Sequence, residues 1–132
     1  MSQENVDAFV RGTAAYNEGD WNAALEAMDP NVEFDLSRVM PEMEVYRGYE
    51  GVKAFWSMLR EVFGEFRTEP EEIIDAGDRL LTRNRLRGTG QASGARTADV
   101  LYQVVTFRDG RPIRVVFFRD RAEALEAAGL PE

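Results

Sequence analysis

Residues 97–120 read TADVLYQVVTFRDGRPIRVVFFRD and contain the strongest strand signals of the chain. Two runs rich in β-branched and aromatic residues, 97–108 and 112–120, flank the dipeptide Asp109-Gly110. Such a dipeptide between two β-rich runs is typical of a tight hairpin. The stretch therefore predicts two paired antiparallel strands near the end of the chain.

Strand patterns continue on the N-terminal side of this hairpin. Residues 66–76 and 79–87 are predicted strands joined by a turn at Gly77-Asp78, and a glycine-punctuated loop through Gly94 follows them. Residues 32–36 alternate between apolar and polar side chains, which is the pattern of a half-buried strand. Residues 37–46 are expected to form a loop, with a short extended piece near Val45.

Helical patterns precede most of the strands. Apolar side chains recur at helical spacing over residues 2–19, 20–29 and 52–63, and a last short helix is predicted at 122–128. Helices followed by an antiparallel meander predict a segregated α+β fold. The 132 residues, 44% of them hydrophobic, are enough for one domain spanning residues 1–132.

The predicted hairpin is apolar on both faces. Leu101, Val105 and Phe107 share one face, and Val100, Tyr102 and Val104 share the other. Since the helices can cover only one face, we expect a homodimer through the outer face of the sheet.

Composition excludes several kinds of chemistry and several partners. The chain has no cysteine and no histidine, so it lacks thiolate metal sites, thiol nucleophiles and the usual general base. Its net charge of −8 opposes binding to nucleic acids and anionic membranes. We expect no metal and no cofactor, because histidine and cysteine are absent and no acidic cluster has the spacing of metal ligands. We expect a cytoplasmic protein, because no signal-peptide or membrane-spanning pattern occurs in the sequence.

Four short motifs occur along the chain: AYNEGDW at residues 15–21, DPNVEF at 29–34, YRGYEGV at 46–52 and FRDGRPI at 107–113. With them the chain resembles the SnoaL-like polyketide cyclase branch of the nuclear transport factor two-like superfamily. The resemblance implies a cone-shaped α+β barrel, in which the three N-terminal helices pack in the concave face of a strongly curved, mostly antiparallel sheet. It implies the fold rather than an activity, because such folds host isomerases, cyclases, hydrolases and noncatalytic binders.

The catalytic sets of related enzymes are incomplete in this chain. The positions that resemble the ketosteroid isomerase residues hold Gly12, Leu36 and Gln103, and Asp35 reaches the base position only through a shift of one residue. The positions that resemble the relay of limonene epoxide hydrolases hold Asn84 and Leu86. Residues Arg83, Arg85 and Arg87 share one strand face, which we interpret as the outer face, in contact with solvent or a dimer partner.

SnoaL-like cyclases use an aspartate assisted by histidine, and this chain has no histidine. Asp99 is the best remaining carboxylate, with Gln103 as a hydrogen-bonding partner on the same strand face, so these two are the catalytic candidates. Both are expected to point into one cavity beneath the third helix. Arg119 is expected at the cavity rim, where it could anchor a ligand or form a salt bridge with Asp99 or a helix acid.

Two functions stay open. The first is noncatalytic binding of a small apolar metabolite, and the second is a cofactor-independent isomerase or cyclase that acts on a small carbonyl or polyketide-like substrate by carboxylate proton transfer. Both use the same expected ligand-binding residues, which are Tyr16, Trp21, Phe34, Leu36, Phe55, Trp56, Leu59, Asn84, Leu101, Phe117 and Arg119.

Overall fold

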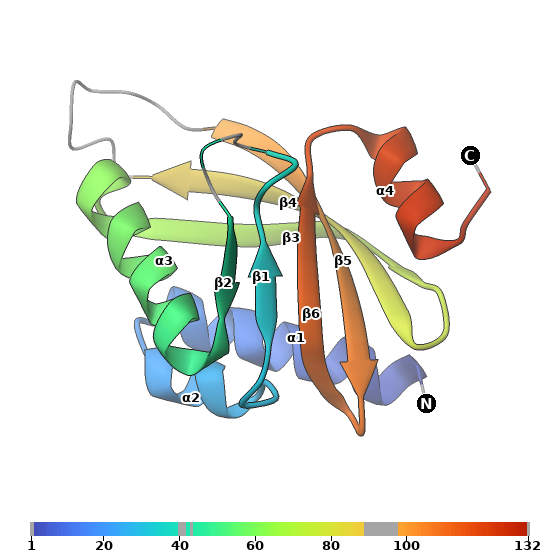
Figure 1. Cartoon of the computed structure of the whole chain (residues 1–132), viewed down its shortest axis with the longest axis horizontal. Coiled ribbons are helices and arrows are strands. Elements are labelled where there is room, and N and C mark those ends of the chain that lie inside the picture. The colour runs from blue at the N-terminus through green and yellow to red at the C-terminus, as the bar shows by residue number, and fades with distance from the viewer. Residues whose placement is uncertain (1, 40–41, 43, 89–97, 132) are drawn as a thin grey trace.

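The computed structural model describes residues 2–39, 42, 44–88 and 98–131. Figure 1 shows four helices and six strands. In chain order they are α1 (Ser2–Asn17), α2 (Trp21–Glu26), β1 (Glu33–Asp35), β2 (Val45–Arg47), α3 (Gly48–Phe63), β3 (Phe66–Asp75), β4 (Arg79–Gly88), β5 (Ala98–Arg108), β6 (Arg111–Phe118) and α4 (Arg121–Ala128).

The six strands form one sheet in the order β2-β1-β6-β5-β4-β3. The β1–β6 pair is parallel and the other neighbours are antiparallel. In Figure 1, β3 and β4 run across the direction of β1 and β6, so the sheet is strongly twisted. The predicted α+β fold, with three N-terminal helices on one side of a mostly antiparallel sheet and a short C-terminal helix, is confirmed.

The third helix starts earlier than its apolar pattern predicted, at Gly48 rather than near Val52. Gly48 has a φ of +71°, which glycine adopts without steric cost, and its amide donates to the carbonyl of Val32 at 2.7 Å. A Cβ atom on Gly51 would lie 3.0 Å from the backbone carbon of Tyr46. The two glycines thus let β2 lead directly into α3. The spacing of apolar side chains could not predict this start, because it depends on the backbone conformation.

The outer face of β3 and β4 carries ion pairs. Glu71 accepts hydrogen bonds from Arg83 at 3.0 Å and Arg85 at 2.6 Å, and Arg87 pairs with Glu69 at 3.0 Å. The hydrogen bond from Arg85, together with the charges of Arg85, Arg83 and Arg87, lowers the pKa of the Glu71 carboxyl below its usual value. The three arginines therefore lie on the outer face, as predicted, and pair with acids of the chain's own neighbouring strand.

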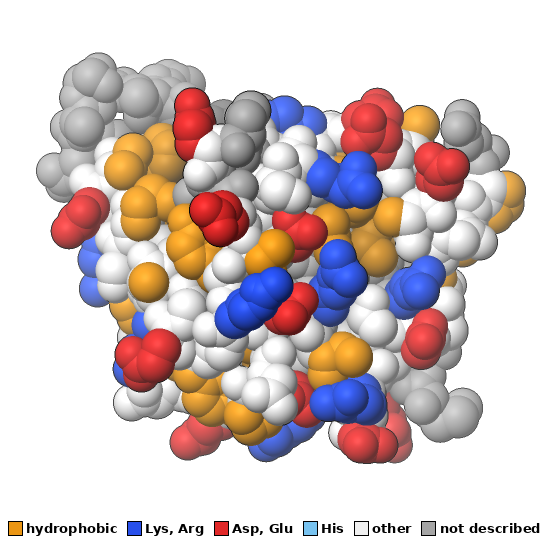
Figure 2. Space-filling model, in the orientation of Figure 1, with side chains coloured by type: hydrophobic (Ala, Val, Ile, Leu, Met, Phe, Trp, Pro, Cys, Tyr) orange, Lys and Arg blue, Asp and Glu red, His pale blue; other side chains and the backbone are white. Residues whose placement is uncertain are grey.

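The outer face of β5 and β6 is covered in part by α4, and Figure 2 shows acidic and basic side chains interspersed over this side of the molecule. Val104 is buried there with Leu81, Phe118 and the apolar side of α4, and Tyr102 packs at the margin of this cluster. Arg121 of α4 stacks over Tyr102, with 5.9 Å from its Cζ atom to the ring centroid. The premise that only one sheet face is covered by the chain's own helices is therefore wrong, because it ignored the last helix. The homodimer stays a prediction. Val104 is buried beneath α4 of its own chain, so a second copy cannot contact it there.

Within the described ranges, no helix is long and apolar enough to cross a bilayer, and no three acidic side chains gather as metal ligands would. The expected cytoplasmic location and the expected lack of a metal or cofactor stay predictions.

Candidate ligand cavity

A cavity of about 520 Å³ lies between α1, α3 and the concave face of the sheet. Its lining comes from most elements of the fold, and α1, α3, β3, β5 and β6 each contribute several side chains. This volume is within the usual range for sites that enclose a small organic molecule.

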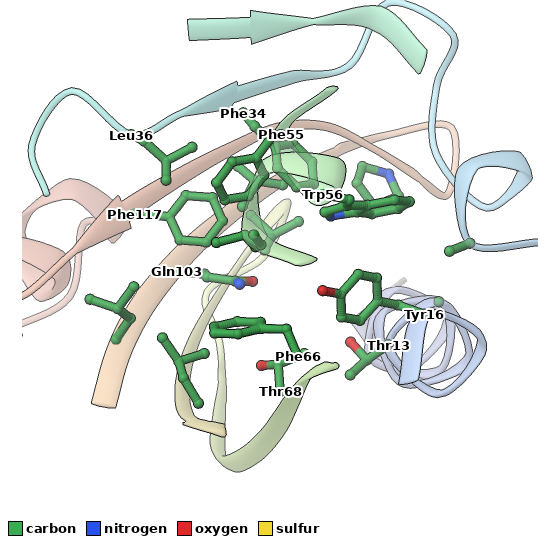
Figure 3. A pocket seen from close by; sticks show the side chains of 18 of the residues that line it. Thr13, Tyr16, Phe34, Leu36, Phe55, Trp56, Phe66, Thr68, Gln103 and Phe117 are labelled. Carbon is green, nitrogen blue, oxygen red and sulfur yellow. The ribbon is translucent and has the colours of Figure 1, made fainter. Parts of the chain in front are cut away.

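Aromatic rings form much of one wall (Figure 3). Trp56 packs against Tyr16 with ring centroids 4.9 Å apart, and Phe34, Phe55 and Phe117 contact one another at 5.8–6.2 Å. Helical spacing in α3 and strand alternation in β1 and β6 direct these rings to the same side. The wall is therefore built from four elements, which are α1, β1, α3 and β6.

Apart from Arg119 at the rim, four polar side chains interrupt the apolar lining: Thr13, Tyr16, Thr68 and Gln103. Figure 3 shows the hydroxyl of Tyr16 and the amide of Gln103 directed toward the same space, with Thr13 next to Tyr16 and Thr68 next to Phe66. Thr68 Oγ1 is inaccessible to solvent and has no hydrogen-bond partner in the described part of the chain. These side chains form what we call the polar spot of the cavity.

Burial raises the pKa of the Tyr16 phenol to about 12, and the charge of Arg60 opposes this rise only in part. The charged form of tyrosine is penalised because the surrounding rings cannot replace water around an anion. Tyr16 is therefore a neutral hydroxyl at physiological pH and can both donate and accept a hydrogen bond.

Asn17 fixes the position of Thr68. Its Nδ2 donates to the Thr68 carbonyl at 2.8 Å, and its Oδ1 accepts from the Thr68 amide at 3.0 Å. Since β3 is an edge strand, these backbone groups face away from β4 and would otherwise be unpaired. Asn17 thus holds the end of α1, which carries Tyr16, against the strand that carries Thr68.

Replacing Asn17 with alanine is expected to lower the free energy of unfolding by about 1–3 kcal/mol, because it leaves two partly buried backbone groups unpaired. Urea unfolding followed by circular dichroism measures this loss. Asn22→Ala is the control, since Asn22 is exposed on α2. Equal losses in the two variants would show that the paired hydrogen bonds of Asn17 contribute no stability of their own.

The structure brings together most of the predicted site residues. Ten of them line the cavity: Tyr16, Phe34, Leu36, Phe55, Trp56, Leu59, Leu101, Gln103, Phe117 and Arg119. Arg119 lies exposed at the rim, where its Nε donates to the carbonyl of Val39 at 3.4 Å. The side chain of Asp99 lies outside the described residues, and only its backbone is placed, in β5 opposite Leu86.

Two predicted residues do not line the cavity. Trp21 lies behind Trp56, with 5.6 Å between their ring centroids, and Arg60 stacks on its other side at 4.6 Å. Asn84 is 1% exposed, and its Nδ2 donates to Thr82 Oγ1 at 2.8 Å and to the Leu101 carbonyl at 3.4 Å. Both residues face inward as predicted, but neighbouring side chains separate them from the open volume.

Several lining residues were missed from the sequence. The most informative are Thr13 and Thr68, and the others include Phe66, Val62, Phe63, Met58 and Gly12. Thr13 lies one helical turn before Tyr16, and Thr68 shares a strand face with Phe66, so both had a detectable signal. Neither was selected, because threonine is common at half-buried positions that bind nothing.

A family model described as SnoaL-like domain matches residues 6–115. Three solved structures with the same fold were compared. TerC, co-crystallised with polyporic acid, is 24% identical, with a TM-score of 0.77 over 96% of this chain and 98% of that chain. Bal32a from a soil-derived mobile gene cassette is 21% identical, with a TM-score of 0.80 over 96% of each chain.

The third is a protein of Jannaschia sp. described as a SnoaL-like polyketide cyclase. It is 22% identical, with a TM-score of 0.73 over 99% of this chain and 95% of that chain. No curated protein matches the sequence. At these identities the solved structures show the shared fold, whereas the family model covers most of the chain. The chain belongs to the SnoaL-like domain family.

Proposed function

We propose that this protein binds a small, largely apolar metabolite in the cavity between α1, α3 and the sheet. The observation that carries the proposal is the cavity of about 520 Å³ with an aromatic wall and one polar spot. Cavities of this kind recognise ligands by burying their apolar surface, while a few polar groups set the orientation. TerC, which shares the fold, has been co-crystallised with the small molecule polyporic acid, in keeping with such a role.

Blocking the cavity tests this proposal. Leu101→Trp places a larger ring in the lining, whereas Val10→Trp adds the same ring at a side chain that is 46% exposed. Calorimetry with 2-methylnaphthalene is expected to detect binding to the native protein and to Val10→Trp, and at least tenfold weaker binding to Leu101→Trp. No binding to the native protein, or equal binding to all three proteins, would contradict the proposal.

The alternative is a cofactor-independent isomerase or cyclase that moves a proton on a small carbonyl or polyketide-like substrate. One observation favours it: the neutral hydroxyl of Tyr16 and the amide of Gln103 face the same space, and such donors stabilise an enolate oxygen. Tyr16 and Arg119 are the titratable side chains among the described lining residues, so the base would have to be Asp99.

Asp99→Asn separates the two functions. It should abolish turnover if the carboxylate is the base, and it should leave ligand affinity nearly unchanged if the protein only binds.

A further inference from the structure

The polar spot contains side chains that have no hydrogen-bond partner among the residues that the structure describes. No side-chain hydrogen bond joins Thr13, Tyr16 or Gln103 to another residue that the structure describes, and Thr68 Oγ1 is both buried and unpartnered there. Buried polar groups in native proteins are nearly always hydrogen-bonded, because an unmade bond costs the full desolvation penalty. Thr13, Tyr16 and Gln103 line the open volume, so a molecule in the cavity can complete their bonds, whereas Thr68 Oγ1 is closed off from that volume.

The polar spot is placed to contact one group from two sides. Thr13 and Tyr16 come from α1, whereas Thr68 and Gln103 come from the facing strands β3 and β5 (Figure 3). Asn17 joins the two sides by its paired hydrogen bonds to the Thr68 backbone. Hydroxyl and amide groups can each donate and accept, so a single oxygen between the two sides would find partners on both.

The surroundings of the polar spot disfavour charge. Burial raises the pKa of Tyr16 to about 12, which reports how poorly this part of the cavity solvates an anion. Arg119, the one cationic group among the described lining residues, lies exposed at the rim. A carboxylate at the polar spot would pay the same desolvation cost as a tyrosinate.

We infer that the ligand is an uncharged aromatic or alicyclic compound whose hydroxyl or carbonyl oxygen is held between Tyr16 and Gln103. The inference rests on the proposed function and names the chemical class of its ligand. The rings of Trp56 and Phe55 would cover the apolar body, while the polar spot would select the oxygen.

Three naphthalene compounds of similar size test the inference. 2-Naphthol and 2-methylnaphthalene differ by a hydroxyl in place of a methyl group, and 2-naphthoate adds a charged arm. We expect the native protein to bind 2-naphthol about three- to tenfold more tightly than 2-methylnaphthalene in calorimetry, the usual net effect of one hydrogen bond. Tyr16→Phe should reduce this ratio to near one while leaving binding of 2-methylnaphthalene unchanged.

Gln103→Leu replaces the amide with an apolar side chain of similar size, and it is the second variant if Tyr16→Phe fails to fold. It should also reduce the ratio. Tyr102→Phe is the control, because Tyr102 lies on the outer sheet face and should leave the ratio unaltered.

The outcomes separate the inference from the proposed function. Equal affinity of the native protein for 2-naphthol and 2-methylnaphthalene would overturn the inference and leave the proposed function standing. Tighter binding of 2-naphthoate than of 2-naphthol would also overturn it, since it would place an anion site at the cavity. Binding of none of the three probes would overturn both.

Discussion

Trp56→Ala is expected to lower the free energy of unfolding by about 3–5 kcal/mol, the usual cost of removing a large buried ring. The Trp56 side chain is 5% exposed, and its ring packs against those of Tyr16, Trp21 and Phe34. Its removal would enlarge a cavity that already exists, so the neighbouring rings would lose contacts that they cannot regain by small shifts. Urea unfolding followed by circular dichroism measures the loss.

Val10→Ala is the matched control, because Val10 is 46% exposed on α1 and its truncation should change stability by no more than about 0.5 kcal/mol. A loss below about 1 kcal/mol for Trp56→Ala would mean that the aromatic wall is not packed in solution as it is in the structure. Addition of 2-methylnaphthalene provides a second measurement. A ligand that fills the enlarged space should recover part of the lost stability by binding only the folded state.

Phe118→Ala is expected to cost a similar 3–5 kcal/mol on the opposite face of the sheet. The Phe118 side chain is 2% exposed in the cluster beneath α4, and Arg38 lies over its ring at 5.3 Å from the centroid. Since α4 has only eight residues, it depends on this cluster rather than on its own helix propensity. The same denaturation experiment should therefore show the loss, and amide exchange in α4 should become faster than in the native protein.

Arg114→Ala is the control for this variant. Arg114 lies four residues before Phe118 on the same face of β6, but its side chain is exposed. It forms an ion pair with Asp35 at 3.6 Å, and such a surface pair contributes about 0–1 kcal/mol. If Phe118→Ala and Arg114→Ala destabilised the protein equally, α4 would not be packed on the sheet in solution, and the outer face would again be open to a dimer partner.

The sequence predicted the strand faces well because alternation is a local property. Leu80, Thr82 and Asn84 are buried on the inner side of β4, and Arg83 and Arg85 lie on the outer side, as their period of two requires. The same alternation along β5 predicts that Gln103, Leu101 and Val105 share a face, and all three line the cavity. No information from outside the strand is needed for such assignments, which explains why they agree with the structure.

The spacing of apolar residues along a helix or strand could not predict which inward-facing residues border open space. Trp56 and Trp21 belong to neighbouring helices and both point inward, but only Trp56 reaches the cavity, because it lies between Trp21 and the open volume. Asn84 faces inward as well, and its neighbours close over it. Exposure to a cavity depends on how several elements pack together, and this is not encoded in the pattern of any one of them.

The sequence by itself therefore determined the class of fold, the helices and strands, and the composition of an apolar interior with few ionisable groups. Only the tertiary structure decided that Thr68 and Tyr16 share one polar spot, that Asn17 joins the two elements carrying them, and that α4 covers Val104. The physical reason is the range of the interactions. Secondary structure follows from contacts within a few residues, whereas Asn17 and Thr68 are 51 positions apart and meet only once the sheet has curved around the helices.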